Sequence, residues 1–379
     1  MNETVLQFGT GNFLRGFVDY FIDQANRNSA TAFGKIVVVQ STGMKQAEAL
    51  NRAGGRYHLA VQGFRGGRVV DETETVSSIS RALHAGTQWA EVLEVAQSPH
   101  LKWIVSNTTE AGFALDEADA LRNPASCPVS YPAKLLAALL ARQQAGQPPL
   151  AITPCELIEE NGTRLRALVL EQGTRWGVTE EVLRWVGDSC GWVNNLVDRI
   201  VPGKPKAHPM LEMDPLLLSA EPFAFWAIQS EGSFPLSHPA ILVSPDIRPY
   251  FLRKVRILNG AHSALVAYAL PKGLRTVLDC MKDPTTLTWL EGLLFEEIVP
   301  TLDGRVEDPE GFARDTLERF RNPFLEHQLA SIALNHEAKV KVRLRPTLEE
   351  FHAKFGRECP RLGELLNADC VPVGASAPM

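Results

Sequence analysis

The chain has 379 residues, a net charge of −6 and no long run of basic residues. This balance gives no electrostatic support for nucleic-acid binding, and no polybasic or amphipathic segment favours a membrane surface. At about 100–200 residues per domain, the length predicts two domains. The start, "MNETVLQFGTGNF", lacks the features of a signal peptide, and the six cysteines form no CxxC pair, so we expect a cytoplasmic protein with reduced thiols.

The N-terminal segment reads as a strand, a glycine turn, a helix and a second strand. After the apolar run "TVLQF" and the turn "GTG", the stretch "NFLRGFVDYFIDQANRN" predicts one helix with Phe13, Phe17, Tyr20 and Phe21 on one side. The next strand, "KIVVVQ" (35–40), ends in the polar turn "STG". This order predicts the beginning of a parallel βαβ unit.

Two further apolar runs, 100–107 and 148–155, predict strands. A leucine- and alanine-rich helix is expected between them at 131–146, and another helix follows at 162–172. Strands that alternate with helices predict an α/β protein with a Rossmann-like, doubly wound sheet. We therefore predict an N-terminal Rossmann-like domain over residues 1–205.

The pattern changes after this point. The stretch "PGKPKAHPMLEMDP" is rich in proline and predicts a linker or crossing segment. The region 206–379 is expected to form a second, mainly α-helical domain that carries the substrate and the catalytic groups. Its predicted helices are 247–269, 284–301, 309–321, 323–336 and 347–355.

The glycine turn suggests a nucleotide site. Gly9 permits a tight turn, and Gly11 lets backbone N–H groups approach a pyrophosphate at the start of the following helix. The third glycine of the GxGxxG pattern is replaced by Leu14, with Gly16 two residues later. A tight turn without a ligand explains the motif equally well, but its position after the first strand favours a nucleotide.

The end of the second strand leaves the choice of nucleotide open. NAD-binding sheets usually carry a carboxylate here for the ribose hydroxyls, and NADP-binding sheets carry an arginine. This chain has Gln40, Ser41 and Thr42 instead. Gln40 and Ser41 could still bond the ribose, so the residues themselves exclude neither NAD nor NADP.

Polar side chains follow the later strands as well. In open α/β sheets, ligands bind at the carboxyl ends of the strands. Each polar group by itself could be a capped loop, but several groups at one edge favour a binding site. These groups are Ser106, Asn107, Thr108, Thr109 and Glu110, then Cys155 and Glu156, then Asn194 and Asn195.

The stretch "KVRILNGAHS" places polar residues in an otherwise buried helix that begins near residue 247. At about 100° per residue, Lys254, His262 and Asn259 lie at about 0°, 80° and 140°, so all three project from one side. A surface lysine with two hydrogen-bonded core residues is the alternative. Hydride transfer to a carbonyl, however, needs a proton carrier and donors for the developing alkoxide, and a buried lysine and an asparagine supply these.

The spacing Lys254-x4-Asn259-x2-His262 resembles the signature of the polyol-specific long-chain dehydrogenases, the mannitol dehydrogenase family. The resemblance extends over nearly the whole chain. The hexuronate branch of the family is the most similar, especially around "PCELIEENG". The matching strings are "QFGTGNFLRG", "SSISRAL", "SNTTEAG", "YPAKL", "PCELIEENG", "NNLVDRI", "KVRILNGAHS" and "EEIVPTL".

The resemblance implies a metal-independent reduction of a keto sugar acid with NADH, from tagaturonate to altronate. It implies that Lys254 is the general acid/base, that Asn259 and Asn194 stabilise the oxyanion, and that His262 binds substrate hydroxyls. It further implies that Gly9, Gly11, Asn12 and Phe13 hold the pyrophosphate, and that Glu110 and the 155–161 loop, with Glu156 and Asn161, border the nicotinamide and the substrate. Gln40, Ser41 and Asn107, at the strand ends, are the other candidate cofactor contacts.

The chain departs from the polyol members of the family at two places. Gln229 and Ser230 stand where those members carry an acidic residue, and Ser331 stands where they carry a substrate-binding arginine. A nearby basic stretch, "KVKVRLRP", could hold the substrate carboxylate, or could be a solvated strip. Its candidate residues are Arg343 and Arg345, followed by Lys339 and Lys341.

Three other functions compete with this interpretation. A fructuronate reductase or a polyol (mannitol) 2-dehydrogenase would share the chemistry. A dinucleotide-sensing protein without turnover would share the fold but would not need a proton carrier. A metal hydrolase that uses His327, His336 and Glu337 has weak ligand spacing. We expect a monomer or a small homo-oligomer whose partner is a small molecule.

Overall fold

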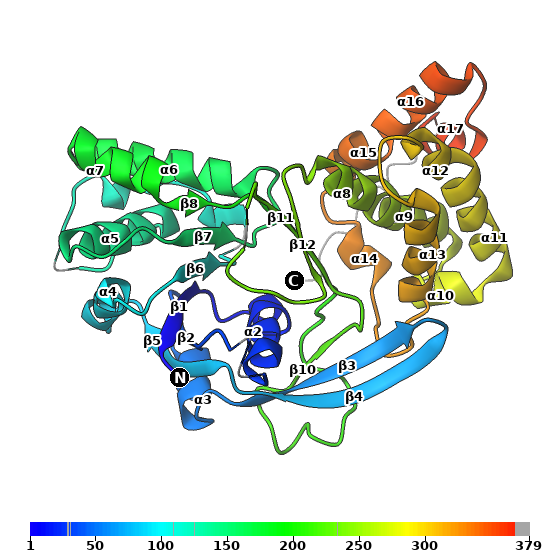
Figure 1. Cartoon of the computed structure of the whole chain (residues 1–379). Helices are drawn as coiled ribbons and strands as arrows, with labels where there is room; N and C mark the ends of the chain where they lie inside the picture. The colour runs from blue at the N-terminus through cyan, green and yellow to red at the C-terminus, as the bar shows by residue number, and fades with distance from the viewer. Residues whose placement is uncertain (29, 31, 109, 125, 233, 368–379) are drawn as a thin grey trace. The chain divides into compact units, whose positions relative to one another are not determined.

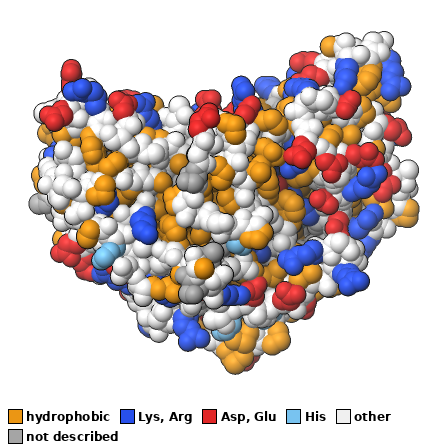
Figure 2. All heavy atoms as spheres, in the orientation of Figure 1, with side chains coloured by type: hydrophobic (Ala, Val, Ile, Leu, Met, Phe, Trp, Pro, Cys, Tyr) orange, Lys and Arg blue, Asp and Glu red, His pale blue; other side chains and the backbone are white. Residues whose placement is uncertain are grey.

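The computed structural model describes residues 1–367 except residues 29, 31, 109, 125 and 233. The chain divides into two compact units (Figure 1). Unit 1 contains Met1–Val61 and Glu72–Ile247, and unit 2 contains Gln62–Asp71 and the residues from Arg248 onward. Within the described part, no helix is both long and apolar enough to cross a membrane. On the face shown in Figure 2, acidic and basic side chains are interspersed.

A six-stranded parallel sheet forms the core of unit 1. Its strand order is β5-β2-β1-β6-β7-β8. The chain adds strands on one side of β1 and then, from β6 onward, on the other side, which creates a switch point between β1 and β6. The strands are β1 (Glu3–Phe8), β2 (Lys35–Gln40), β5 (Ile79–His84), β6 (Trp103–Ser106), β7 (Ala151–Pro154) and β8 (Gly191–Trp192).

Helices connect these strands and bury their apolar sides. Helix α5 begins where the Ser130 hydroxyl accepts the N–H of Ala133, and Pro132 occupies its first turn. Helices α4, α5 and α6 pack in sequence and share one hydrophobic core with the sheet (Figure 1). The helices of this unit are α1 (Asn12–Arg15), α2 (Val18–Asn26), α3 (Lys45–Arg52), α4 (Trp89–Gln97), α5 (Tyr131–Gln144), α6 (Asn161–Arg175) and α7 (Glu180–Arg184).

The single helix predicted after the glycine turn is wrong, because the chain breaks into α1 and α2 at Gly16 and Phe17. Gly16 lies so close to Val201 that an added Cβ would be 2.8 Å from its Cγ1. The Gly16 carbonyl accepts a hydrogen bond of 2.8 Å from Nη1 of Arg199. These distant contacts withdraw the Gly16 carbonyl from the helical ladder. Gly16 thus provides the close packing that the third glycine of GxGxxG usually provides.

Two smaller sheets complete unit 1. In one, β3 (Tyr57–Arg65) lies between β4 (Arg68–Val76) and β10 (Leu218–Ala220), and only the tip of the β3–β4 hairpin belongs to unit 2. In the other, β11 pairs antiparallel with β9 and parallel with β12. These strands are β9 (Asn195–Asp198), β11 (Phe225–Gln229) and β12 (Ile241–Ser244). Strands β10, β11 and β12 follow residue 205 in the chain and belong to unit 1.

Unit 2 is mainly helical, so the predicted fold class, an α/β sheet followed by a helical region, is confirmed. Helix α9 is its central element, with Ala261, Ala264 and Leu265 fully buried. Its segments are α8 (Arg248–Arg253), η4 (Lys254–Asn259), α9 (Gly260–Ala269), α10 (Val277–Lys282), α11 (Pro284–Gly292), η6 (Leu293–Ile298), α12 (Val299–Leu302), α13 (Pro309–Phe320), α14 (Leu329–Ile332), α15 (His336–Arg343), α16 (Arg345–Phe355) and α17 (Pro360–Asn367).

The helix predicted at 323–336 is also wrong. Asn322 anchors the start of this segment, because its amide donates to the Gln62 carbonyl and its oxygen accepts the N–H of Phe324. The backbone around Gln328 then forms an antiparallel bridge with Thr276. Bonds to another part of the chain hold the segment extended, and only the short α14 remains helical.

Candidate active site

The glycine turn follows β1 and contains two glycines, Gly9 and Gly11, which differ in backbone conformation and in the space around them. Gly9 has φ +122°, and an added Cβ would lie 2.9 Å from the Asn107 carbonyl oxygen. Its conformation and its neighbour therefore both require glycine. Gly11 has an ordinary φ of −65°, and an added Cβ would meet no atom within 4 Å. Gly11 thus leaves open space beside the backbone, which suits the close approach of a ligand.

A cavity of about 490 Å³ opens at the carboxyl ends of β1, β2 and β6, at the switch point of the sheet. Its size is within the usual range for a site that holds a small molecule. Its lining includes Gly9, Gly11, Ser41, Asn107, Tyr131 and Lys134.

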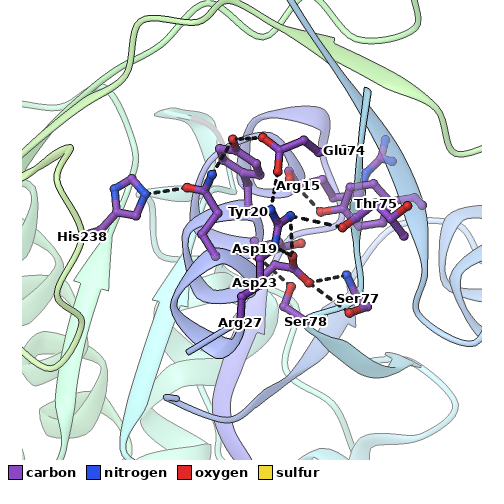
Figure 3. A network of polar contacts seen from close by, with 12 residues as sticks. Arg15, Asp19, Tyr20, Asp23, Arg27, Glu74, Thr75, Ser77, Ser78 and His238 are labelled. Carbon is purple, nitrogen blue, oxygen red and sulfur yellow. Dashed lines mark hydrogen bonds and ion pairs between the residues drawn. The ribbon is translucent and has the colours of Figure 1, made fainter. Parts of the chain in front are cut away.

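A larger depression on unit 1 is a less suitable ligand site. It has a volume of about 660 Å³ and is lined by Asp23, Arg27 and Glu74 among others. Arg27 pairs with Glu74 at 2.6 Å and with Asp23 at 3.0 Å, and the Tyr20 hydroxyl donates to Glu74 (Figure 3). These charged groups satisfy one another, so we assign this depression no ligand.

The predicted cofactor residues occupy different environments. Ser41 is exposed at the end of β2. Gln40 is buried, where its Oε1 accepts the Ala47 N–H and its Nε2 donates to the Thr42 carbonyl, both at 2.7 Å. Gln40 therefore holds the turn between β2 and α3. The amide of Asn107 donates to the Cys155 carbonyl at 2.7 Å.

Three other predicted cofactor residues lie at the edges of this region. Asn12 is exposed and accepts a hydrogen bond of 2.7 Å from Arg15. Phe13 stacks on Phe17 with a ring-centroid distance of 4.9 Å. Glu110 begins a short 3₁₀ turn, and its side chain lies outside the described part of the structure.

A buried polar cluster that the sequence did not predict lies behind the glycine turn. Burial raises the pKa of Asp19 to about 8, although the nearby Arg15 acts in the opposite direction. The side chains of Gln7 and Tyr57 face the Asp19 carboxylate and also lower its pKa. Oε1 of Gln7 has no hydrogen-bond partner within the described part. A charged residue between the buried aromatics of α2 is the sequence signal that would have identified this cluster. Figure 3 shows Arg15 and Asp19 among the polar residues of α1 and α2.

The predicted substrate residues Glu156 and Asn161 are deeply buried. Glu156 is 2% exposed; its carboxylate accepts the Thr108 N–H at 2.8 Å and the Ser106 hydroxyl at 3.2 Å. Burial raises the pKa of Glu156, and the hydrogen bond from the Thr108 backbone opposes that effect. Asn161 donates to the carbonyls of Glu156 and Asn195, both at 3.1 Å. These bonds join the ends of β6, β7 and β9. The roles of Glu156 and Asn161 in substrate binding stay predictions.

Asn194 is exposed and lies beside the start of α6. Its Oδ1 accepts the Thr163 N–H at 2.9 Å, and its Nδ2 donates to the Thr163 hydroxyl at 3.0 Å. The same Nδ2 also donates to Oε1 of Gln229 at 3.1 Å. Gln229, which stands where the polyol members carry an acidic residue, therefore contacts Asn194, a predicted catalytic residue. The sequence did not indicate this pairing, because the two positions are far apart in the chain.

Lys254 and Asn259 delimit a π-helical turn, η4, between α8 and α9. The angle of about 140° predicted for a regular α-helix is therefore wrong for this pair. A π-helix joins residues five positions apart, and Lys254 and Asn259 are separated by five positions. The π-turn thus brings the amine and the amide closer to the same side of the helix than an α-helix would. Both side chains are half-buried.

His262 follows in the first turn of α9 and is 7% exposed. Burial lowers its pKa well below the usual value, and the nearby His327, Arg319 and Arg343 lower the pKa further. The ring bonds the backbone of Leu258, whereas Nε2 has no partner in the described part. A neutral ring whose Nδ1–H is donated to a carbonyl presents Nε2 as an acceptor.

The two arginines predicted for the substrate carboxylate differ in burial. Arg343 ends α15 and is half-buried, and its Nη1 donates to the Ser263 hydroxyl at 3.2 Å. Arg345 begins α16 and is exposed. Arg319, which the sequence pattern did not indicate, is buried near His262.

Comparison with known proteins gives a consistent result. The family model for the mannitol dehydrogenase Rossmann domain matches residues 3–241, and the model for the mannitol dehydrogenase C-terminal domain matches residues 246–366. An altronate oxidoreductase of Bacillus subtilis (strain 168) is 38% identical over 377 residues, which cover 95% of this chain and 77% of that protein. An altronate oxidoreductase of Klebsiella pneumoniae (strain 342) is 37% identical over 380 residues, 95% of this chain and 77% of the relative.

Solved structures share the fold. The structure of a D-sorbitol dehydrogenase in substrate-free form has a TM-score of 0.86 and 23% identity, and the match covers 97% of this chain and 79% of that one. A Pseudomonas fluorescens mannitol 2-dehydrogenase in a ternary complex with NAD and D-mannitol has a TM-score of 0.78 and 23% identity, with coverage of 97% and 78%. The matched domains, the relatives and the shared fold agree, and the chain belongs to the mannitol dehydrogenase family.

Proposed function

We propose that this protein is an NAD-dependent oxidoreductase that reduces the keto sugar acid tagaturonate to altronate. Family membership supports the reaction class. The altronate oxidoreductases that match with 37–38% identity over at least 91% of this chain support a sugar acid as substrate. In the structure, the proposal depends most on the π-turn that brings Lys254 and Asn259 together. One turn later, Nε2 of His262 has no hydrogen-bond partner among the described residues.

Lys254 is the proposed general acid for the reduction. NADH, when bound, supplies the hydride that is added to the carbonyl carbon. The oxygen of that carbonyl gains negative charge, and the Lys254 ammonium donates a proton to it, so that a neutral hydroxyl forms. In the opposite direction, the neutral amine of Lys254 removes the hydroxyl proton.

Two asparagines are proposed to stabilise the developing alkoxide. Asn259 lies on the same side of η4 as Lys254 and can donate an amide N–H to the same oxygen. Asn194 already donates both amide hydrogens, one to Thr163 and one to Gln229. Its proposed role therefore requires that it exchange one of these bonds, and the side chain of Gln229 is the partner that can rotate away.

His262 is proposed to bind a substrate hydroxyl. Because burial keeps its ring neutral, Nε2 can accept a hydrogen bond from a hydroxyl beside the reacting carbon. An imidazolium could not accept this bond. The neutral ring therefore selects a hydroxyl donor and orients the sugar chain.

NAD is the proposed cofactor, and the cavity at the switch point fits it. Gly9 and Gly11 would lie against the pyrophosphate, since the open space beside Gly11 leaves room for it. Exposed Ser41 would face the ribose, whereas Gln40 is already committed to the turn.

The experiment is to follow NADH oxidation by the purified protein with tagaturonate, fructuronate and fructose in parallel. We expect fast turnover with tagaturonate and slow turnover with the other two. Fast reduction of fructose or fructuronate would reassign the substrate. NADH binding without turnover on any carbonyl would instead indicate a sensing protein. Replacing NADH with NADPH in the same assay checks the cofactor.

A further inference from the structure

The surroundings of His262 in unit 2 are rich in cationic and imidazole groups. Its ring centroid lies 4.8 Å from that of His327, and Arg319 and Arg343 are close enough to lower its pKa. Burial, Lys339 and Arg343 likewise lower the pKa of His336, the first residue of α15. The groups that lower the pKa of these two rings, besides burial, are cationic or imidazole side chains.

Arg343 differs from two other arginines of unit 2, Arg256 and Arg361. Arg256 donates to Thr347 at 2.8 Å and pairs with Glu350 at 2.9 Å. Arg361 pairs with Glu296 at 2.7 Å and with Glu297 at 3.2 Å. Arg343 forms no ion pair with any residue that the structure describes, and its side chain makes one hydrogen bond, to Ser263. A half-buried guanidinium without a carboxylate is costly unless an anion completes it.

The imidazoles beside Arg343 have unused nitrogens. Nε2 of His262 and Nδ1 of His336 are buried and have no hydrogen-bond partner within the described ranges. Buried polar atoms of this kind usually have a partner, so each needs an explanation. Among the described residues, the Arg343 guanidinium lacks an ion pair and the neighbouring imidazole nitrogens lack a hydrogen-bond partner, which fits a ligand that is both anionic and rich in hydroxyl groups.

We propose that Arg343 anchors the carboxylate of the substrate and thereby selects sugar acids over neutral ketoses. This inference rests on the proposed function, because it assigns one end of the same substrate. The planar guanidinium can bind a carboxylate through two parallel hydrogen bonds while Nη1 stays near Ser263. His262 binds a hydroxyl between the carboxylate and the carbonyl.

The order of these residues along the helix matches the order of groups in the substrate. Asn259 is the proposed contact of the substrate carbonyl, and His262 is the proposed contact of a hydroxyl. Ser263 holds Arg343, the proposed contact of the carboxylate, through a hydrogen bond. A rise of about 1.5 Å per residue separates Asn259 from Ser263 by about 6 Å along the axis. This span is comparable with the distance between the keto carbon and the carboxylate in an extended hexuronate chain.

The test compares four variants: Arg343→Gln, Arg343→Lys, Arg345→Gln and the surface control Arg314→Gln. Arg314 is an exposed residue of α13 and pairs with Glu310 in the preceding turn. The first readout is KM and kcat for tagaturonate. The second is the Kd of altronate, measured by calorimetric titration into the NADH complex. Altronate and NADH are both in the reduced state, so they bind together without reaction.

We expect Arg343→Gln to raise KM for tagaturonate and Kd for altronate by about 10- to 100-fold, the usual effect of losing hydrogen bonds to a charged group. Arg343→Lys keeps the charge but loses the planar fork, so its loss should be smaller but clear. The kcat of both variants should change much less than KM, because the contact is present in the ground state and the transition state. Arg345→Gln and Arg314→Gln should resemble the wild type.

Wild-type values of KM and Kd in Arg343→Gln would overturn the inference, and so would a large loss confined to Arg345→Gln. Melting temperature and NADH binding show whether each variant is folded. If Arg343→Gln does not fold, a wild-type KM in Arg343→Lys would contradict the two-bond contact. Failure of the wild-type protein to reduce tagaturonate would refute the proposed function itself, which is a separate outcome.

Discussion

Polar side chains at the carboxyl edge of the sheet in unit 1 differ in their hydrogen bonding from those around His262 in unit 2. In unit 1, Gln40, Glu156 and Asn161 form hydrogen bonds with neighbouring backbone and hydroxyl groups. In unit 2, His262 keeps an unpartnered nitrogen, and Arg343 has no ion pair among the described residues. The first set is hydrogen-bonded within the fold, and the second set keeps hydrogen-bonding groups that no described residue uses. Residue type did not distinguish them, because all five are polar residues near a predicted site.

The largest expected effect that tests this comparison is loss of turnover in Lys254→Ala. Removal of the proton carrier should lower kcat for tagaturonate by about 10²–10⁴-fold, the usual contribution of general acid–base catalysis. NADH binding and melting temperature should change little, because the half-buried amine is proposed to serve the reaction and not the fold. Stopped-flow turnover, NADH titration and thermal unfolding measure the three quantities. A variant that keeps its rate would remove Lys254 from the mechanism.

A smaller effect, on stability, is expected from Glu156. Glu156→Ala leaves the Thr108 N–H and the Ser106 hydroxyl without their buried acceptor. We expect the free energy of unfolding to fall by about 2–4 kcal/mol, as measured by urea denaturation.

Glu156→Gln is the matched control for this prediction. It keeps the shape and an acceptor oxygen, so most of the stability and a near-normal KM for tagaturonate should remain. If Glu156 instead contacts the substrate, Glu156→Gln would raise KM while stability stayed unchanged. That result would move Glu156 from the residues that shape the site to those that bind the ligand.

A third expected effect is the pH dependence of stability caused by Asp19. Its pKa is raised from an ordinary value near 3.8 to about 8 in the folded protein, chiefly by burial. Between these values the folded state holds a proton that the unfolded state has lost, so stability falls as pH rises through this window. The groups that face Asp19 are Arg15, Gln7 and Tyr57.

Asp19→Asn removes this titration. We expect its unfolding free energy to depend less on pH than that of the wild type, with the largest relative gain near and above pH 8. Denaturant unfolding at several pH values measures the difference. Parallel pH profiles for the two proteins would show that Asp19 does not retain its proton in the folded state.

Much of the fold could be predicted from local patterns. The strands at 35–40, the glycine turn and the helix from Tyr131 were predicted because apolar runs, glycines and caps act over a few residues. The split between α1 and α2 could not be predicted, since Val201 and Arg199 cause it from far along the chain. The predicted boundary near residue 205 and the roles of the predicted site residues stay predictions.

The sequence by itself determined the parallel sheet, the family and the spacing of Lys254, Asn259 and His262, because these depend on residue order and on periodicity along one chain segment. Only the tertiary structure decided that the Lys254–Asn259 segment is a π-turn, that Gln40 and Glu156 are already bonded, and that Arg343 rather than Arg345 is half-buried beside Ser263. The physical reason is that hydrogen-bond saturation and burial depend on partners distant in sequence. Local patterns do not specify those partners.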